Sequence, residues 1–183
     1  MAIYSDTFTD EIVRRITDGA IGVIRTDTLY GIVARADNQQ SVERLYKAKQ
    51  RTPSKSPIVL ISSTKQLFDV YSEATLAALD EFWPGKNSII LLSTQAPAWI
   101  TRGNSSVAYR LPGNEALRAV LSQTGPLIAP SANPEGLPPA RTIDEAKAYF
   151  GDEVDFYVNG GVVSDDAPSR LYRFNESTFE RLR

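Results

Sequence analysis

The residues with the clearest chemical potential form a cluster of positive side chains near the end of a predicted helix. Residues 44–57 read RLYKAKQRTPSKSP and contain no acidic residue. The cations of this stretch are Arg44, Lys47, Lys49, Arg51 and Lys55. The chain has a formal net charge of −2, so the rest of it sums to −7. A local positive field on an acidic background can attract an anion such as a phosphate.

Part of this cluster has a simpler explanation. Lys47 and Lys49 lie in the last turn of a predicted helix, where a cation complements the helix dipole by about 0.3–1 kcal/mol. Arg51 and Lys55 lie beyond that helix, in the loop before an apolar run at 58–61. Helix-dipole effects do not reach them, so we expect these cations to converge on one point.

A polar turn follows the apolar run at 20–24. It contains Thr26, Asp27 and Thr28. In open α/β sheets the ligand crevice lies outside the carboxyl ends of the strands, so these side chains are well placed to reach a ligand. The alternative is an ordinary turn in which the threonine hydroxyls bond the backbone.

A second polar segment, PSANPEGLPPART, follows the apolar run at 126–129. Ser131 and Asn133 offer a hydroxyl and an amide that can hold sugar, base or phosphate. The alternative is a rigid, Pro-rich surface loop capped by the asparagine.

The absent residue types exclude most familiar catalytic designs. The chain has no Cys and no His, which rules out thiolate nucleophiles, imidazole bases and the usual zinc sites. It also lacks the GxxxxGK and GxGxxG phosphate loops. The chemistry that remains works by positioning, electrostatics and loosely held Mg²⁺, as phosphoryl and nucleotidyl transfer do.

Composition indicates an ordinary globular protein of 183 residues, with 42% apolar and 23% charged residues. No apolar run approaches the roughly 20 residues of a membrane helix, and the N-terminus has no secretory pattern. We expect a single domain over residues 1–183, located in the cytoplasm and without membrane contact.

Hydrophobic periodicity predicts alternating helices and strands. The helical patterns cover 9–18, 41–49, 73–82, 114–122 and 142–150. The strand-like runs cover 20–24, 58–61, 88–92, 106–111, 126–129, 156–159 and 169–174, and 97–105 is predicted to be a loop. We expect an α/β fold with a twisted, open, mixed sheet flanked by helices. It should be mixed because the last two runs are too close for a crossover, which predicts a hairpin.

Several segments together resemble a known family. They are TDTLYG, KQRTPSK, SANPEGLPPARTIDEA and a Gly-Gly pair followed eight residues later by Ser, with FWPGK at 82–86 and VAYRLP at 107–112 in support. Their order and spacing resemble the YrdC/TsaC family of threonylcarbamoyl-AMP synthases over about residues 20–174. The length is similar to the short bacterial form, so a single YrdC-like domain is expected.

The resemblance implies a reaction and its partners. L-threonine, bicarbonate and ATP with Mg²⁺ would give threonylcarbamoyl-AMP and pyrophosphate. Partner proteins would then transfer the threonylcarbamoyl group to an adenosine beside the anticodon of tRNA. Such a reaction needs fixed cations for the leaving group more than a general base.

The resemblance also implies roles for particular residues. The catalytic residues facing the triphosphate would be Lys49, Arg51 and Lys55. The threonine would be bound by Thr28, Arg110 and Ala129. The nucleotide would be bound by Arg51, Lys55, Ser106, Ser131, Asn133, Arg141 and Ser169. No metal ligand is assigned, because Asp27 either touches the metal or only caps its turn.

Some residues depart from the family pattern. The family usually has Pro at the position of Arg25, and Arg25, Lys86 and Arg170 are expected to add charge near the crevice. Ser56 stands where the family tends to have Pro. Two alternatives follow: a nucleotide-binding paralogue without threonine specificity, or a module that binds double-stranded RNA or tRNA through residues 44–55. A pI of about 5.3 and the lack of aromatic platforms beside the cations argue against the RNA alternative.

Overall fold

The computed structural model describes residues 2–165, 167–175 and 177–183. The helices are α1 (Asp10–Thr17), α2 (Gln39–Ala48), α3 (Glu73–Leu79), α4 (Ala98–Thr101), α5 (Glu115–Thr124) and α6 (Ile143–Phe150), with short 3₁₀ turns η1 (Thr64–Gln66) and η2 (Gly151–Glu153). The strands are β1 (Ile3–Ser5), β2 (Gly22–Arg25), β3 (Tyr30–Arg35), β4 (Ile58–Leu60), β5 (Asn87–Leu92), β6 (Ser106–Arg110), β7 (Leu127–Ile128), β8 (Phe156–Val158), β9 (Arg170–Asn175) and β10 (Thr178–Arg181).

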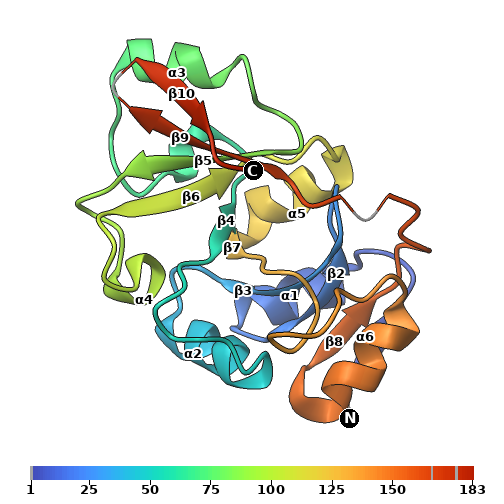
Figure 1. The fold of residues 1–183 in the computed structure, drawn as a ribbon. Coiled ribbons are helices and arrows are strands. Elements are labelled where there is room, and N and C mark those ends of the chain that lie inside the picture. Colours follow the sequence, from blue (N-terminus) through green and yellow to red (C-terminus); the bar gives the residue numbers. More distant parts are fainter. Residues whose placement is uncertain (1, 166, 176) are drawn as a thin grey trace.

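The strands form one sheet in the order β1-β8-β2-β3-β7-β4-β6-β5-β9-β10. β8 pairs in parallel with β1 and β2, and β4–β6 and β5–β9 are also parallel. The remaining pairs, such as the β2–β3 hairpin and β5–β6, are antiparallel. The prediction of a mixed α/β sheet is therefore confirmed. Figure 1 shows β5, β6, β9 and β10 above β2, β3 and β8, with β4 and β7 between them.

The predicted hairpin between the last two apolar runs is wrong. β8 lies between β1 and β2, whereas β9 lies beside β5 in the other half of the sheet. Tight packing helps to fix the place of β8, because a Cβ built on Gly22 would lie 2.4 Å from the ring of its register partner Phe156. Nearness along the chain predicted the wrong neighbour, since pairing here is decided by contacts with distant strands.

Local signals predicted the helices better than the strands. Thr9, Asn38, Asn114 and Thr142 cap their helices, each accepting a backbone N–H with its side chain. α3 ends three residues earlier than predicted, and the predicted loop at 97–105 contains the one-turn helix α4. The strands β1, β3 and β10 were not predicted.

The sheet has an apolar core on each face. Successive residues of β2 belong to different clusters, Val23 to one and Ile24 to the other, and Ile32 and Val33 of β3 divide in the same way. One cluster includes α1 and α5 residues, and the other includes residues of α2, α4 and α6. In the described part of the chain, no helix has the length and apolar character needed to cross a bilayer.

We predict that Gly22→Ala destabilises the fold by about 1–3 kcal/mol, because the added methyl group must displace the buried Phe156 ring. Urea unfolding measures this change. Gly113→Ala is the matched control, since its Cβ would meet only Gly85 Cα at 3.8 Å. Equal stability of the two variants would contradict this account of β8 packing.

Candidate functional site

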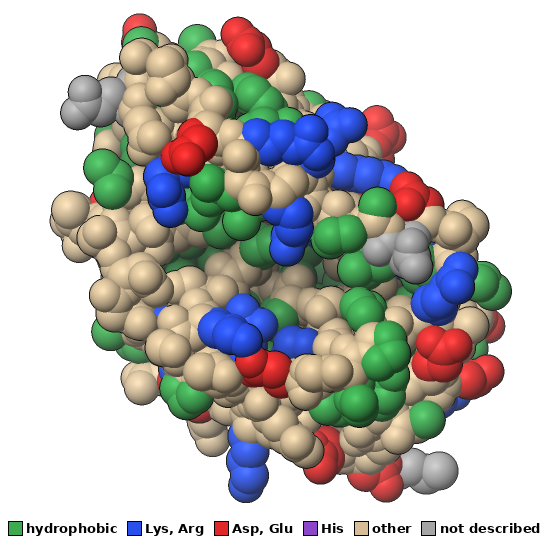
Figure 2. All heavy atoms as spheres, viewed as in Figure 1, with side chains coloured by type: hydrophobic (Ala, Val, Ile, Leu, Met, Phe, Trp, Pro, Cys, Tyr) green, Lys and Arg blue, Asp and Glu red, His purple; other side chains and the backbone are tan. Residues whose placement is uncertain are grey.

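A cavity of about 830 Å³ opens between the two halves of the sheet. Its walls come from the β2–β3 turn, residues 51–56, the sheet strands β4, β5 and β6, residues 129–131, and the segment leading into β9. We call residues 51–56 the basic loop and residues 131–139 the proline loop. Figure 2 shows the hollow near the centre of the molecule, with Lys and Arg side chains on both sides of it.

The charged residues lining the cavity are all positive. They are Arg51, Lys55, Arg110, Arg173 and Arg183. No Asp or Glu is among the described residues that line it. A concave surface of one charge sign concentrates its field, so the cavity suits a ligand with several negative charges.

One end of the cavity is built around a buried arginine. Arg110 is 4% exposed, and its Nη2 lies 3.1 Å from Asp27 Oδ1 and 3.4 Å from Thr26 Oγ1. Burial lowers the pKa of Arg110, while the nearby Asp27 raises it. Among the described residues the Arg110 guanidinium bonds only through Nη2, and the residue lines the cavity, so it has donor capacity left for an acceptor there.

The two threonines of the β2–β3 turn have different roles. Thr26 Oγ1 donates to Leu29 O at 2.7 Å and accepts from Thr28 N at 3.2 Å, which is the ordinary turn chemistry. The Thr28 hydroxyl contacts only Thr26 Oγ1, at 3.1 Å, and both residues line the cavity. Thr28 therefore has hydrogen-bonding capacity left for a ligand.

Asp27 holds Arg110 in place without lining the cavity itself. One carboxylate oxygen pairs with Arg110, and the other accepts from Gly113 N at 3.2 Å. This placement makes Asp27 the counter-ion of Arg110. The sequence does not show whether Asp27 binds a metal or supports the turn, because no local pattern identifies Arg110 as its partner.

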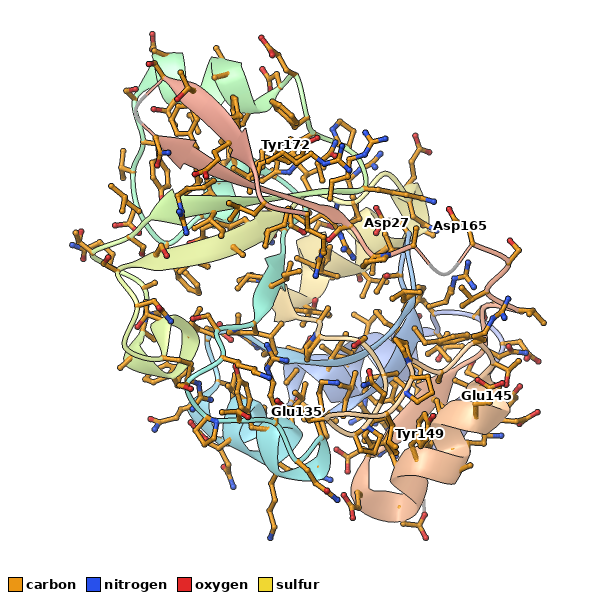
Figure 3. All side chains as sticks on the ribbon, in the orientation of Figure 1. Asp27, Glu135, Glu145, Tyr149, Asp165 and Tyr172 are labelled. Atoms are coloured by element: carbon orange, nitrogen blue, oxygen red, sulfur yellow. The ribbon has the colours of Figure 1, made fainter. Side chains whose placement is uncertain are left out.

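The basic loop is at the other end of the cavity. Arg51 donates from Nη2 to Ser56 O at 3.0 Å and from Nε to Lys55 O at 3.3 Å, so its guanidinium braces the loop. Lys55 pairs with Glu135 of the proline loop. Figure 3 shows Glu135 and Asp27 well apart in this view, consistent with their contacts at opposite ends of the cavity.

Glu135 ties the two loops together. Its carboxylate accepts from Thr52 N at 2.5 Å and Thr52 Oγ1 at 3.0 Å, in addition to the Lys55 ammonium. Lys55 and Thr52 lower the pKa of Glu135 to about 2. The carboxylate therefore stays ionised. It accepts hydrogen bonds from Thr52 and Lys55, and these donors could also bind a phosphate. Nothing in the sequence signalled this role.

Lys49 lies elsewhere than predicted. It does not line the cavity and is only 3% exposed. Its ammonium donates to Ser131 O at 2.7 Å, Asn133 O at 2.5 Å and Asn133 Oδ1 at 3.2 Å. Burial, reinforced by Arg51, lowers the pKa of Lys49 to about 8. The end of α2 thus delivers this lysine beneath the proline loop, where it acts as an anchor.

Asn133 is a second anchor. Its amide donates to Pro134 O and Leu137 O, at 2.9 and 2.7 Å, and its Oδ1 accepts from Ser131 Oγ at 2.6 Å. Like Lys49, it does not line the cavity. Asn133 therefore caps the loop from a buried position, as the alternative reading expected of its amide, whereas Ser131 lines the cavity.

Of the other residues that were predicted to bind threonine or the nucleotide, some line the cavity and one does not. Ala129, Ser106 and Ser169 line the cavity, and Ser169 Oγ lies 2.9 Å from Ser88 Oγ. Arg141 is exposed outside it, with its guanidinium 3.3 Å from Val163 O.

Arg183 was missed because it lies beyond the segments that carry the family pattern. It lines the cavity and donates to Ser169 O at 3.1 and 3.2 Å. Arg173 of β9 was missed as well, since a strand pattern does not tell which of its polar residues faces a ligand.

The three charges that were expected near the crevice do not line the cavity, although Arg170 lies between two residues that do, Ser169 and Leu171. Arg25, Lys86 and Arg170 are all absent from its walls. Arg25 packs against Gly160, where a Cβ would lie only 2.2 Å from Arg25 Cβ. Lys86 Nζ is 3.4 Å from Asp165 Oδ2.

Fold and site together define a class: an α/β domain with a cationic cavity, suited to a small anionic ligand, between the halves of a mixed sheet. The family model Sua5_yciO_yrdC, described as "Telomere recombination", matches residues 14–183. The chain belongs to the Sua5/YciO/YrdC family.

Named relatives span most of the chain. The threonylcarbamoyl-AMP synthase of Marinobacter nauticus is 33% identical over 175 residues, covering 91% of this chain and 92% of that one. The threonylcarbamoyl-AMP synthase of Pseudomonas fluorescens strain Pf0-1 is 30% identical, with coverage of 88% and 89%. The crystal structure of P. abyssi Sua5 complexed with L-threonine has a TM-score of 0.87 and 26% identity. It matches all of this chain, which spans 57% of the Sua5 chain.

We predict that Lys49→Met destabilises the fold by about 2–3 kcal/mol at pH 7, because three buried oxygens lose their donor. This deficit should grow by about 2 kcal/mol between pH 8 and pH 10. The folded protein releases the Lys49 proton near pH 8, whereas the unfolded chain keeps it to about 10.5, so the parent gains stability as the pH rises. Urea unfolding of both proteins at each pH measures the difference.

Lys47→Met is the control, since Lys47 is exposed on the same helix. It should stay within about 0.5 kcal/mol of the parent at every pH. A Lys49→Met deficit that is flat with pH would contradict the lowered pKa.

Proposed function

We propose that this chain is an L-threonylcarbamoyladenylate synthase, which uses L-threonine, bicarbonate and ATP. The observation that carries the proposal is a cavity whose described lining residues include five cations and no carboxylate, with a buried arginine at one end and the basic loop at the other. The relatives named threonylcarbamoyl-AMP synthase and the threonine complex of P. abyssi Sua5 support it.

The two ends of the cavity suit two parts of the reaction. Arg110 lines the cavity with donor capacity left for the threonine carboxylate, and Thr28 has a hydroxyl for another polar group of the amino acid. Arg51 and Lys55 suit the triphosphate, whereas Arg183 lies close enough to Arg110 to lower its pKa. The cavity thus holds an amino acid and a nucleotide with their reacting atoms between the two ends.

The chemistry needs no imidazole or thiol. The threonine amine and bicarbonate form a carbamate and water. A carbamate oxygen then attacks the α-phosphorus, the bond between this phosphorus and the bridging oxygen breaks, and pyrophosphate leaves with the electron pair. The chain supplies positioning and the cations that stabilise the negative charge developing on the leaving group.

Magnesium would enter as the metal of MgATP. Among the described residues, no group of three or more acidic side chains could hold a metal ion, and Asp27 is taken up by Arg110. The site therefore fits a Mg²⁺ ion whose ligands are chiefly the phosphate oxygens of ATP and water molecules.

The product would pass to proteins that transfer the threonylcarbamoyl group to tRNA. The alternative of a paralogue without threonine specificity loses its main argument, because Arg25, Lys86 and Arg170 lie outside the cavity. Direct RNA binding by the basic loop is not favoured either, since Arg51 and Lys55 line the cavity.

The purified protein should release pyrophosphate from MgATP only when both threonine and bicarbonate are present. The measurement is coupled pyrophosphate detection with each substrate omitted in turn. Release without threonine, or equally well with other amino acids, would overturn the proposal in favour of a paralogue.

Thr28→Val should raise the KM for threonine about fivefold and leave the KM for ATP within twofold. The variant keeps the side-chain shape and removes one hydrogen bond, which is worth about 1 kcal/mol. Steady-state pyrophosphate release measures both constants. Thr17→Val is the control, because its exposed hydroxyl bonds only Val13 O of the same helix. An unchanged KM for threonine would remove Thr28 from the site.

A further inference from the structure

Arg102 is a mostly buried arginine that does not line the cavity and lies at the end of α4. It adopts the left-handed backbone conformation with φ 53°, which is uncommon for a residue with a side chain. Its side chain is 10% exposed, with Nη1 2.9 Å from Glu43 Oε1. Nε and Nη2 are buried without a partner in the described protein. A conformation this costly persists only where the surroundings fix it.

The partner that fixes Arg102 is the ring of Tyr46. The Arg102 guanidinium carbon lies 3.9 Å from the ring centroid, the distance of a close cation–π contact. The same ring also faces the Arg51 guanidinium, at 5.7 Å. Tyr46 therefore contacts one cation that lines the cavity and one that does not.

The Tyr46 hydroxyl connects this contact to the basic loop. It donates to Lys55 O at 2.7 Å, and Arg51 Nε shares that acceptor at 3.3 Å. Any change in the tilt of the ring therefore shifts the backbone of Lys55 and the guanidinium of Arg51 together.

The turn that contains Arg102 also contacts the loop directly. Ser56 Oγ donates to Thr101 O at 2.7 Å and accepts from Asn104 Nδ2 at 2.9 Å. Ser56, which stands where Pro is usual in the family pattern, gives the loop this second attachment. Residues 101–104 thus support the basic loop both at Ser56 and through Tyr46.

We propose that Arg102 is a positioning residue that holds Arg51 and Lys55 in place through Tyr46 and so sets the affinity of the cavity for the phosphates of ATP. This inference rests on the proposed function for its ligand. A loop that is already ordered loses less conformational freedom on binding, which makes binding tighter. Threonine affinity should be independent of Arg102, since Thr28 and Arg110 lie at the other end of the cavity.

The experiment uses Arg102→Met, which keeps a long side chain and removes the guanidinium. Titration calorimetry should give a Kd for MgATP about tenfold higher than that of the parent, and a Kd for threonine within twofold. Hydrogen exchange should be faster at the amides of Arg51 and Lys55, which are bonded to Tyr46 O and Thr52 O. General destabilisation would instead weaken both ligands.

Two further variants test whether Arg102 acts on the basic loop through Tyr46. Glu43→Gln removes the ion pair, leaves the ring contact, and should keep the parental MgATP affinity. Tyr46→Phe removes the hydroxyl and should weaken MgATP severalfold. Combined with Arg102→Met, its effect should be less than additive, because both act through one ring. Should Arg102→Met fail to fold, Arg102→Lys tests the loss of the planar contact in its place.

The two proposals fail in different ways. If the parent binds no MgATP, the proposed function is wrong, and hydrogen exchange alone decides the positioning role. Unchanged loop exchange together with unchanged MgATP affinity in Arg102→Met would overturn the positioning role and leave the synthase proposal intact.

Discussion

The buried Lys49 ammonium is the contact on which the rest of the site depends. Its bonds to Ser131 O, Asn133 O and Asn133 Oδ1 join the end of α2 to the proline loop. Glu135 N reinforces the junction by donating to Lys49 O at 3.0 Å. With the loop held there, the Glu135 carboxylate reaches Lys55, and the basic loop closes one end of the cavity. A buried charge of this kind contributes mainly by fixing geometry, because its removal leaves several polar groups without partners.

Carboxylates around the cavity hold its cations without entering it. Asp27 pairs with Arg110 and Glu135 pairs with Lys55, and neither acid lines the cavity. The interior therefore keeps its positive field while the arginine and lysine remain ordered. The two pairs differ in burial: the side chains of Arg110 and Asp27 are 4% and 7% exposed, those of Lys55 and Glu135 55% and 27%. An incoming phosphate can compete with Glu135 in the exposed pair, whereas Asp27 stays with its arginine.

This arrangement accounts for how a chain without His or Cys can be built for nucleotidyl transfer. Every chemical demand of the proposed reaction falls on hydrogen-bond donors and fixed positive charge. Their placement depends on residues that do not line the cavity, such as Lys49 beneath the proline loop, Asn133 within that loop, and Tyr46 beside the basic loop. Most of the specific architecture of the site therefore lies in residues that do not touch the ligand.

Composition and local patterns indicated the kind of chemistry, most of the helices, and the segments that meet at the site. These follow from composition and from local periodicity, which reflects the burial of nearby residues. The tertiary structure decided which strand pairs with which, separating β8 from β9, and which cations face the cavity. Lys49 and Arg51 are two residues apart, yet one is buried under a loop 82 residues away and the other lines the cavity. The direction of a side chain depends on such distant partners, and a local pattern does not contain them.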